Sequence, residues 1–305
     1  MASFRITATA LLATLVASML VVATANAQSV QRPLRPSASQ GIPVIPFMEG
    51  WYDNADGSIT VSFGYHNRNK ENIVVPKGDN NFIVPAAMNG MQPEVYFPGR
   101  HHGVFAVTIP MDREDETVWW HLISAGQELK VPGERGSSAY ELDRNPRPQG
   151  SVQPLIWFDD GQQGSGPEGV VAATTKTTTV GSPIALEVFT EDPSKRDRSD
   201  PRFIKPLDTR VSWYKHQGPG EVSFSEHDST PLVESREGEV LGLIPAPEVA
   251  VMVSGGKGPA RVMASFSEPG DYLVRARLDN WKSSDSDGLD QCCWSNAYQR
   301  IRVTQ

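Results

Sequence analysis

The sequence predicts an all-β protein that consists of two β-sandwiches in tandem behind a signal peptide. Three observations lead to this fold class. Apolar and polar residues alternate over many short runs, as they do in half-buried strands. Glycine and proline are frequent, with 26 and 24 residues, and they separate these runs at strand-like intervals. No apolar repeat of 3.6 residues is sustained over three turns after the N-terminal leader, so helices are not expected.

Residues 1–27 have the three parts of a secretory signal peptide. A short start with Arg5 precedes an apolar stretch from Ile6 to about Ala23, and Ala25-Asn26-Ala27 supplies small residues for cleavage. The alternative is a membrane anchor, but Thr7, Thr9, Thr14 and Ser18 dilute the stretch, and a spanning helix needs roughly 20 strongly apolar residues. We therefore expect export to the periplasm or the extracellular space, with no membrane span once the signal is removed.

The charge balance excludes some partners. The chain has 28 basic and 36 acidic residues, and removing the leader with Arg5 changes the net charge from −8 to −9. A chain this acidic has no electrostatic attraction for nucleic acid or for anionic lipid.

The first folded region is expected at residues 47–142, after a flexible leader at 28–46 that is rich in Pro, Ser and Gln. Apolar residues alternate from Ile59 to Tyr65, and the turn signal Asp56-Gly57 makes Trp51-Tyr52 the partner strand of a hairpin. Further alternating runs end this region, at 105–109, 118–122 and 129–131.

The second folded region is expected at residues 153–305, beyond a polar linker at 143–152 that contains two prolines. Two long polar segments, 190–207 and 226–258, are predicted to be loops within it. Its alternating strands are predicted around 184–188, 211–213, 222–224, 262–266, 272–278 and 301–303.

Three sequence runs in the second region resemble PKD-type and related bacterial immunoglobulin-like domains. They are VSWYK at 211–215, GPGEVSF at 218–224 and ASFSEPGDYLVRA at 264–276. The resemblance covers about residues 180–305 and implies a β-sandwich with Trp213 as its core anchor. It also implies that Tyr272 forms a tyrosine corner, with its ring buried and its hydroxyl bonded to a nearby carbonyl.

The whole chain is also similar to exported bacterial proteins that join GWYDNADGS and FGYHNRN to a CCW tail. That resemblance implies a compartment and a fold but no activity, because immunoglobulin-like folds serve many functions.

The two cysteines, Cys292 and Cys293, are adjacent. An exported protein meets oxidising conditions, which favour a disulfide. Neighbouring Cα atoms lie ~3.8 Å apart, below the usual disulfide range, so a vicinal bridge would be strained. Two buried thiols on opposite faces of a strand are the alternative. We predict a vicinal disulfide that stiffens a turn.

Three carboxylates, Asp285, Asp287 and Asp290, lie in a loop that contains Gly288. Oxygen ligands around a glycine turn suit Ca²⁺, so calcium is a candidate cofactor and the only one. A solvated acidic turn is the alternative, since Ser283 stands where a further aspartate would be needed and no glutamate closes the loop.

Trp119 and His121 are candidates for a binding surface. Adjacent residues on a strand point to opposite faces, so both lie on the outer face if Trp120 is in the core. Exposed aromatic side chains bind sugar rings or a partner protein. The alternative is that a loop or the neighbouring domain covers Trp119.

No sequence motif supplies a reaction. The chain has no G-x-S-x-G, no H-E-x-x-H and no phosphate-binding glycine loop. The favoured interpretation is an exported, non-catalytic binding or scaffold protein whose partner is a protein or a glycan. The alternatives are a hydrolase of envelope or carbohydrate material with loop carboxylates, and a calcium-stiffened adhesion module.

Overall fold

The computed structural model describes residues 41–136, 140–142, 150–230, 249–280 and 294–305. Residues 38–305 form one compact unit. The predicted signal peptide, and residues 28–40 of the predicted leader, lie outside the described residues. So do Cys292, Cys293, Asp285, Asp287 and Asp290.

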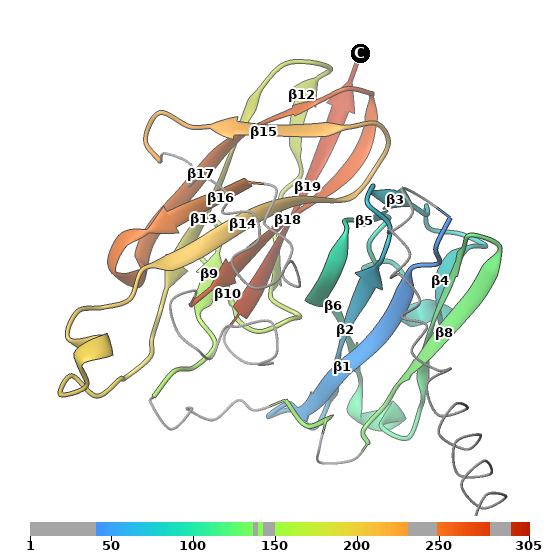
Figure 1. Cartoon of the computed structure of the whole chain (residues 1–305), viewed down its shortest axis with the longest axis horizontal. Coiled ribbons are helices and arrows are strands. Elements are labelled where there is room, and N and C mark those ends of the chain that lie inside the picture. The colour runs from blue at the N-terminus through green and yellow to red at the C-terminus, as the bar shows by residue number, and fades with distance from the viewer. Residues whose placement is uncertain (1–40, 137–139, 143–149, 231–248, 281–293) are drawn as a thin grey trace, which may run out of the picture. The chain divides into compact units, whose positions relative to one another are not determined.

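The first sandwich consists of two three-stranded antiparallel sheets and a short strand pair (Figure 1). The first sheet has the order β1-β2-β6, and the second has the order β4-β7-β8. Their bounds are β1 (Ile45–Asp53), β2 (Ile59–Asn67), β3 (Ile73–Val74), β4 (Asn81–Val84), β5 (Val95–Tyr96), β6 (Gly99–Ile109), β7 (Val118–Ser124) and β8 (Gln127–Gly133). Its described residues also include the 3₁₀ turns η1 (Ala86–Met88) and η2 (Met111–Arg113).

Aromatic side chains from both sheets fill the core of the first sandwich. Phe63 and Phe105 stack at 5.2 Å, and the Trp120 indole meets Phe105 edge-on at 5.0 Å. The predicted hairpin of β1 and β2 is confirmed, since Asp53 pairs with Ile59 across the turn. The burial of β7 alternates strictly, which places Val118, Trp120 and Leu122 inside.

The second sandwich packs a five-stranded sheet, β10-β9-β13-β17-β15, on a sheet of order β11-β19-β18-β14-β16, in which β12 also pairs with β19. The bounds are β9 (Leu155–Trp157), β10 (Gln163–Gly164), β11 (Val170–Val171), β12 (Lys176–Thr179), β13 (Ile184–Glu191), η4 (Pro201–Phe203), β14 (Thr209–Gln217), β15 (Val222–Glu226), β16 (Val249–Val253), η5 (Ser254–Gly256), β17 (Lys257–Phe266), β18 (Gly270–Asp279) and β19 (Trp294–Thr304).

The strand order in the second sandwich is that of an immunoglobulin fold. The run β9-β13-β17-β15 matches strands A, B, E and D, and β14, β18 and β19 match strands C, F and G. Figure 1 shows β14, β18 and β19 lying side by side, and their antiparallel pairing agrees. The predicted all-β, immunoglobulin-like fold class is therefore confirmed.

Two expected loop boundaries are wrong. The segment 226–258 is not one loop, because β16 and η5 lie within it. The run VAVMV of β16 is only five residues long. It becomes a strand by pairing with β14, and the local sequence does not reveal that pairing. The leader also ends earlier than residue 46, since β1 begins at Ile45, opposite His66.

A bulge in β6 connects the two sandwiches. Phe63 pairs with Phe105 and Tyr65 with His101, so β6 advances four residues while β2 advances two. The carbonyls of the bulge, at residues 102–104, turn toward the second sandwich. They accept hydrogen bonds from Arg277 Nη1 (2.9 Å), Asn296 Nδ2 (2.8 Å), Arg275 Nη1 (2.9 Å) and Tyr298 Oη (3.0 Å).

Candidate functional site

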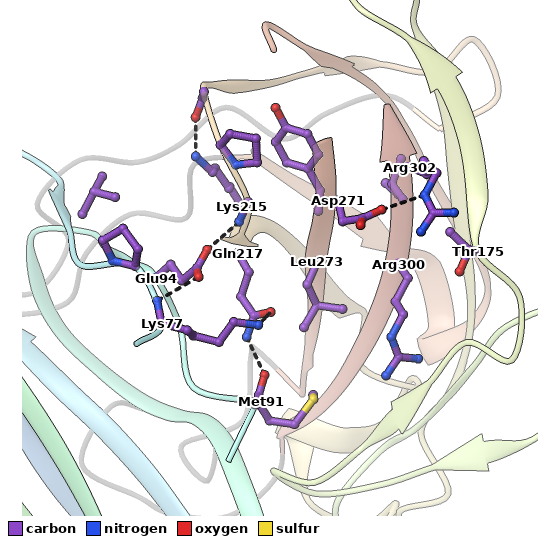
Figure 2. Close-up of a pocket in the computed structure, with 18 of the residues that line it drawn as sticks. Lys77, Met91, Glu94, Thr175, Lys215, Gln217, Asp271, Leu273, Arg300 and Arg302 are labelled. Carbon is purple, nitrogen blue, oxygen red and sulfur yellow. Dashed lines mark hydrogen bonds and ion pairs between the residues drawn. The ribbon is translucent and has the colours of Figure 1, made fainter. Parts of the chain in front are cut away.

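A groove of about 900 Å³ is the candidate functional site (Figure 2). The segment 74–94 of the first sandwich lines one side of it. The second sandwich supplies the other side, from the β14–β15 turn, from the start of β18 and from the end of β19.

Glu94 fixes the first side of the groove to the second. Its Oε1 accepts the backbone N–H of Lys77 at 2.9 Å, and its Oε2 accepts that of Gly218 at 2.8 Å. Its own N–H donates to the carbonyl of His216 at 2.8 Å. Both carboxylate oxygens are therefore used by the backbone, and this carboxylate serves to hold the groove together.

Gln217 continues the same connection. Its Nε2 donates to the carbonyls of Gly90 and Gln92, both at 2.8 Å, and its Oε1 accepts from Lys77 Nζ at 2.7 Å. A register shift in β14 between Lys215 and Gln217 places this amide beside the segment 74–94. These bonds fix the shape of the groove floor.

His216 lies behind the floor and is 2% exposed. Its Nε2 donates to the carbonyl of Met91 at 2.7 Å, and its ring meets Tyr298 edge-on at 5.3 Å. Burial, together with the positive charges of Arg275 and Lys77, lowers the pKa of His216 to about 3. The imidazole is therefore neutral, and it supports the groove as a hydrogen-bond donor.

Two arginines project from β19 beside the groove, and only one of them is neutralised. Arg302 and Arg300 alternate with the buried Ile301 and Val303, so both point outward. Arg302 Nε donates to Asp271 Oδ1 at 2.9 Å. Arg300 makes no side-chain hydrogen bond or ion pair with the described residues.

Glu168, like His216, has a pKa that burial shifts strongly, but it lies outside the groove lining. Its carboxylate accepts a hydrogen bond from the hydroxyl of Tyr52. Burial raises the pKa of Glu168 to about 7. The contact joins β1 to the segment between β10 and β11, so its protonation state affects stability.

We expect the substitution Glu168→Gln to flatten the pH dependence of stability between pH 4.5 and pH 7. In this range the folded chain keeps the Glu168 proton and the unfolded chain loses it, so stability falls as pH rises. The shift of the pKa to about 7 corresponds to about 3 kcal/mol of unfolding free energy, which the wild type loses as the pH rises and the glutamine variant keeps. Urea unfolding at pH 4.5 and pH 8 measures this, and an equal loss in both proteins would contradict it.

The sequence-predicted residues occupy several separate places. Trp213 is 1% exposed in the core of the second sandwich. Tyr272 Oη donates to the carbonyl of Glu268 at 2.8 Å, and Tyr272 also lines the groove. Trp119 and His121 lie on the outer face of β7, outside the groove lining.

The outer face of β7 is partly covered by its own neighbours. The Lys130 ammonium lies 4.9 Å from the centre of the Trp119 ring. His121 stacks on Phe82 at 4.5 Å, and its Nδ1 lies 2.8 Å from Glu128 Oε1. These contacts leave both side chains half-buried, and we do not place the site there.

The sequence predicted no binding site at the groove, although it singled out one lining residue, Tyr272, for a structural role. The alternation in QRIRV, at 299–303, does predict that Arg300 and Arg302 point outward. It does not reveal that Asp271 neutralises only Arg302, because that depends on the register of β18 against β19. In the described part of the chain, no three His, Cys, Asp or Glu side chains gather as a metal site would require.

Comparisons with known proteins find distant structural likenesses and no family. No family model and no curated protein matches it. The D00-D0 domain of intimin is similar over 86% of this chain and 100% of its own, at 9% identity and a TM-score of 0.26. The D0-D1 domain of intimin covers 85% and 97%, at 12% identity and a TM-score of 0.23. A titin segment covers 85% and 99%, at 11% identity and a TM-score of 0.19. TM-scores this low carry no argument about function.

Proposed function

We propose that the chain is an exported, non-catalytic binding protein and that the groove at the β14–β15 turn is its binding site. The observation that carries this proposal is the construction of the groove. Its floor is fixed by hydrogen bonds between distant segments, and its walls combine apolar side chains with charged groups. Ligand sites are typically preformed in this way, with a few polar groups set among apolar ones.

The carboxylates of the groove favour binding over hydrolysis. Glu94 spends both oxygens on backbone N–H groups, and Asp271 is paired with Arg302. Two of the three lining carboxylates are therefore not poised as a general acid or base, a role that needs a group free to exchange its proton with the substrate; the third, Glu221, is exposed. The export of the protein rests on the predicted signal peptide. Among the described residues, no helix has the length and apolar character that crossing a bilayer requires.

The variant Thr175→Trp tests the site. Thr175 is exposed and lines the groove, so an indole there fills space in the groove without disturbing a core. Thr177→Trp is the matched control, because Thr177 is exposed on the same segment and is not part of the lining. Tagged wild-type protein and both variants would be recovered from the cell envelope, and the molecules that co-purify would be compared by mass spectrometry.

We expect at least one molecule to co-purify with the wild type and with Thr177→Trp, and to be reduced about tenfold or more with Thr175→Trp. Equal recovery with all three proteins, or no molecule whose recovery depends on the groove, would overturn the proposal. Equal thermal unfolding of the two variants would exclude a folding defect as the cause.

A further inference from the structure

We propose that the groove selects its ligand by a carboxylate held between Arg300 and Lys77, next to an apolar group that packs on Leu273 and Met91. This inference rests on the proposed function, because it assigns a ligand chemistry to the same groove. It is independent of where the carboxylate comes from, a small acid or an acidic side chain of a peptide.

The contrast between Arg300 and Arg302 is the first step. The two side chains are exposed on one face of β19, two residues apart. The register of β18 places Asp271 opposite Arg302 and Leu273 opposite Arg300. Arg302 therefore has a carboxylate partner, whereas Arg300 stands beside an apolar side chain with its guanidinium donors unused by the described residues.

Lys77 supplies the second cation. An ammonium has three donors, and Lys77 Nζ gives one of them to Gln217 Oε1, which is uncharged. The nearby carboxylate of Glu94 accepts the backbone N–H of Lys77 rather than its ammonium. No carboxylate in the described residues forms an ion pair with Lys77.

The charge of the lining is opposite to that of the chain. The lining holds four cations, Lys77, Lys215, Arg300 and Arg302, and three acids, Glu94, Glu221 and Asp271, so its net charge is 4 − 3 = +1. The chain as a whole carries −8. The positive field of the lining attracts anions to this groove, whereas the acidic remainder of the surface repels them.

The geometry of the donors favours a carboxylate among anions. A guanidinium presents two parallel N–H groups that match the two oxygens of a carboxylate. Figure 2 shows Lys77, Gln217, Leu273 and Arg300 around one hollow, with Met91 at its edge. Leu273 pairs with Arg300 across β18 and β19 and is 5% exposed, so the part of its side chain that lines the groove gives the ligand an apolar contact beside Arg300.

The floor holds Lys77 in place before any ligand binds. The backbone of Lys77 is held by Glu94, and its ammonium is held by Gln217, whose own amide is bonded to two carbonyls. Preorganised donors lose little conformational entropy on binding, which raises their contribution to affinity.

The test compares two probes that differ only in charge. N-acetyl-leucine and N-acetyl-leucinamide would be titrated into the exported form of the protein, and binding would be followed by the NMR signals of the Met91 and Leu273 methyl groups. We expect the acid to bind at least about tenfold more tightly than the amide, since hydrogen bonds to charged groups are the stronger kind. This preference should decrease at high salt.

The variants Arg300→Gln and Arg68→Gln form a matched pair, because each removes one exposed arginine and Arg68 lies outside the groove lining. Arg300→Gln should reduce the preference for the acid to about twofold or less, whereas Arg68→Gln should retain it. Both residues are exposed, so neither change disturbs a core. Equal binding of acid and amide, or equal effects of the two substitutions, would overturn the inference.

A second probe pair identifies the source of the carboxylate. Ac-Leu-Glu-Leu-NH₂ and Ac-Leu-Gln-Leu-NH₂ carry the same contrast in the middle of a peptide. Binding of the glutamate peptide with the same dependence on Arg300 indicates an acidic peptide segment, and binding of N-acetyl-leucine alone indicates a small acid.

The inference and the proposed function fail in different ways. A groove-dependent ligand in the Thr175→Trp experiment, together with equal binding of acid and amide, leaves the binding function and removes the carboxylate preference. Acid-selective probe binding that depends on Arg300, without any groove-dependent ligand from the envelope, leaves the preference and removes the binding function.

Discussion

Replacing Gly103 with alanine is expected to destabilise the protein by about 2–5 kcal/mol. Gly103 has φ +53°, in the left-handed region, which costs an L-residue about 1–2 kcal/mol. A Cβ at this position would meet the Trp294 ring at 2.1–2.4 Å. Trp294 is 2% exposed and carries the Arg277 guanidinium on its ring, so relieving the clash costs a further ~1–3 kcal/mol.

Gly126→Ala is the matched control for this prediction. Gly126 has φ +71°, and a Cβ there would meet no atom within 4 Å. It therefore has the cost of the left-handed backbone without the clash, about 1–2 kcal/mol. Urea unfolding of both variants separates the two contributions. An equal loss of stability in Gly103→Ala and Gly126→Ala would show that the bulge of β6 does not pack tightly against Trp294.

The substitution His216→Gln is expected to make stability less sensitive to acid. In the unfolded chain the imidazole takes up a proton near pH 6.5, whereas the buried ring in the folded chain does so only near pH 3. Between these values the unfolded chain binds one more proton, so the free energy of unfolding falls as the pH falls. The slope is about 1.4 kcal/mol per pH unit, and the total loss by pH 3 is about 4–5 kcal/mol.

A glutamine at position 216 has no charge to gain, and its amide can donate to the carbonyl of Met91 as the imidazole does. Stability curves from pH 7 to pH 4 should therefore differ in slope by about 1.4 kcal/mol per pH unit. Burial also lowers the pKa of His101 to about 3, so the His216→Gln variant should keep the part of the acid sensitivity that His101 contributes. Parallel curves for the wild type and His216→Gln would contradict the prediction.

Much of the fold could be predicted because its signals are local. The alternation in β2 and β7 and the Asp56-Gly57 turn depend on residues that are close in sequence. β16 was missed for the opposite reason. Its five residues become a strand because they pair with β14, about 40 residues earlier along the chain.

The sequence by itself determined the all-β class and the outward position of Arg300 and Arg302, and its resemblance to PKD-type domains implied the inward position of Trp213. The first two follow from the two-residue period of a strand, which is written in consecutive residues. Only the tertiary structure decided which of the two arginines is neutralised, because Asp271 reaches Arg302 through the pairing of β18 with β19. It also decided the groove itself, since the bond from Gly218 to Glu94 joins residues 124 positions apart. Contacts of this kind depend on strand register and on bulges, and neither is encoded in a local pattern of residues.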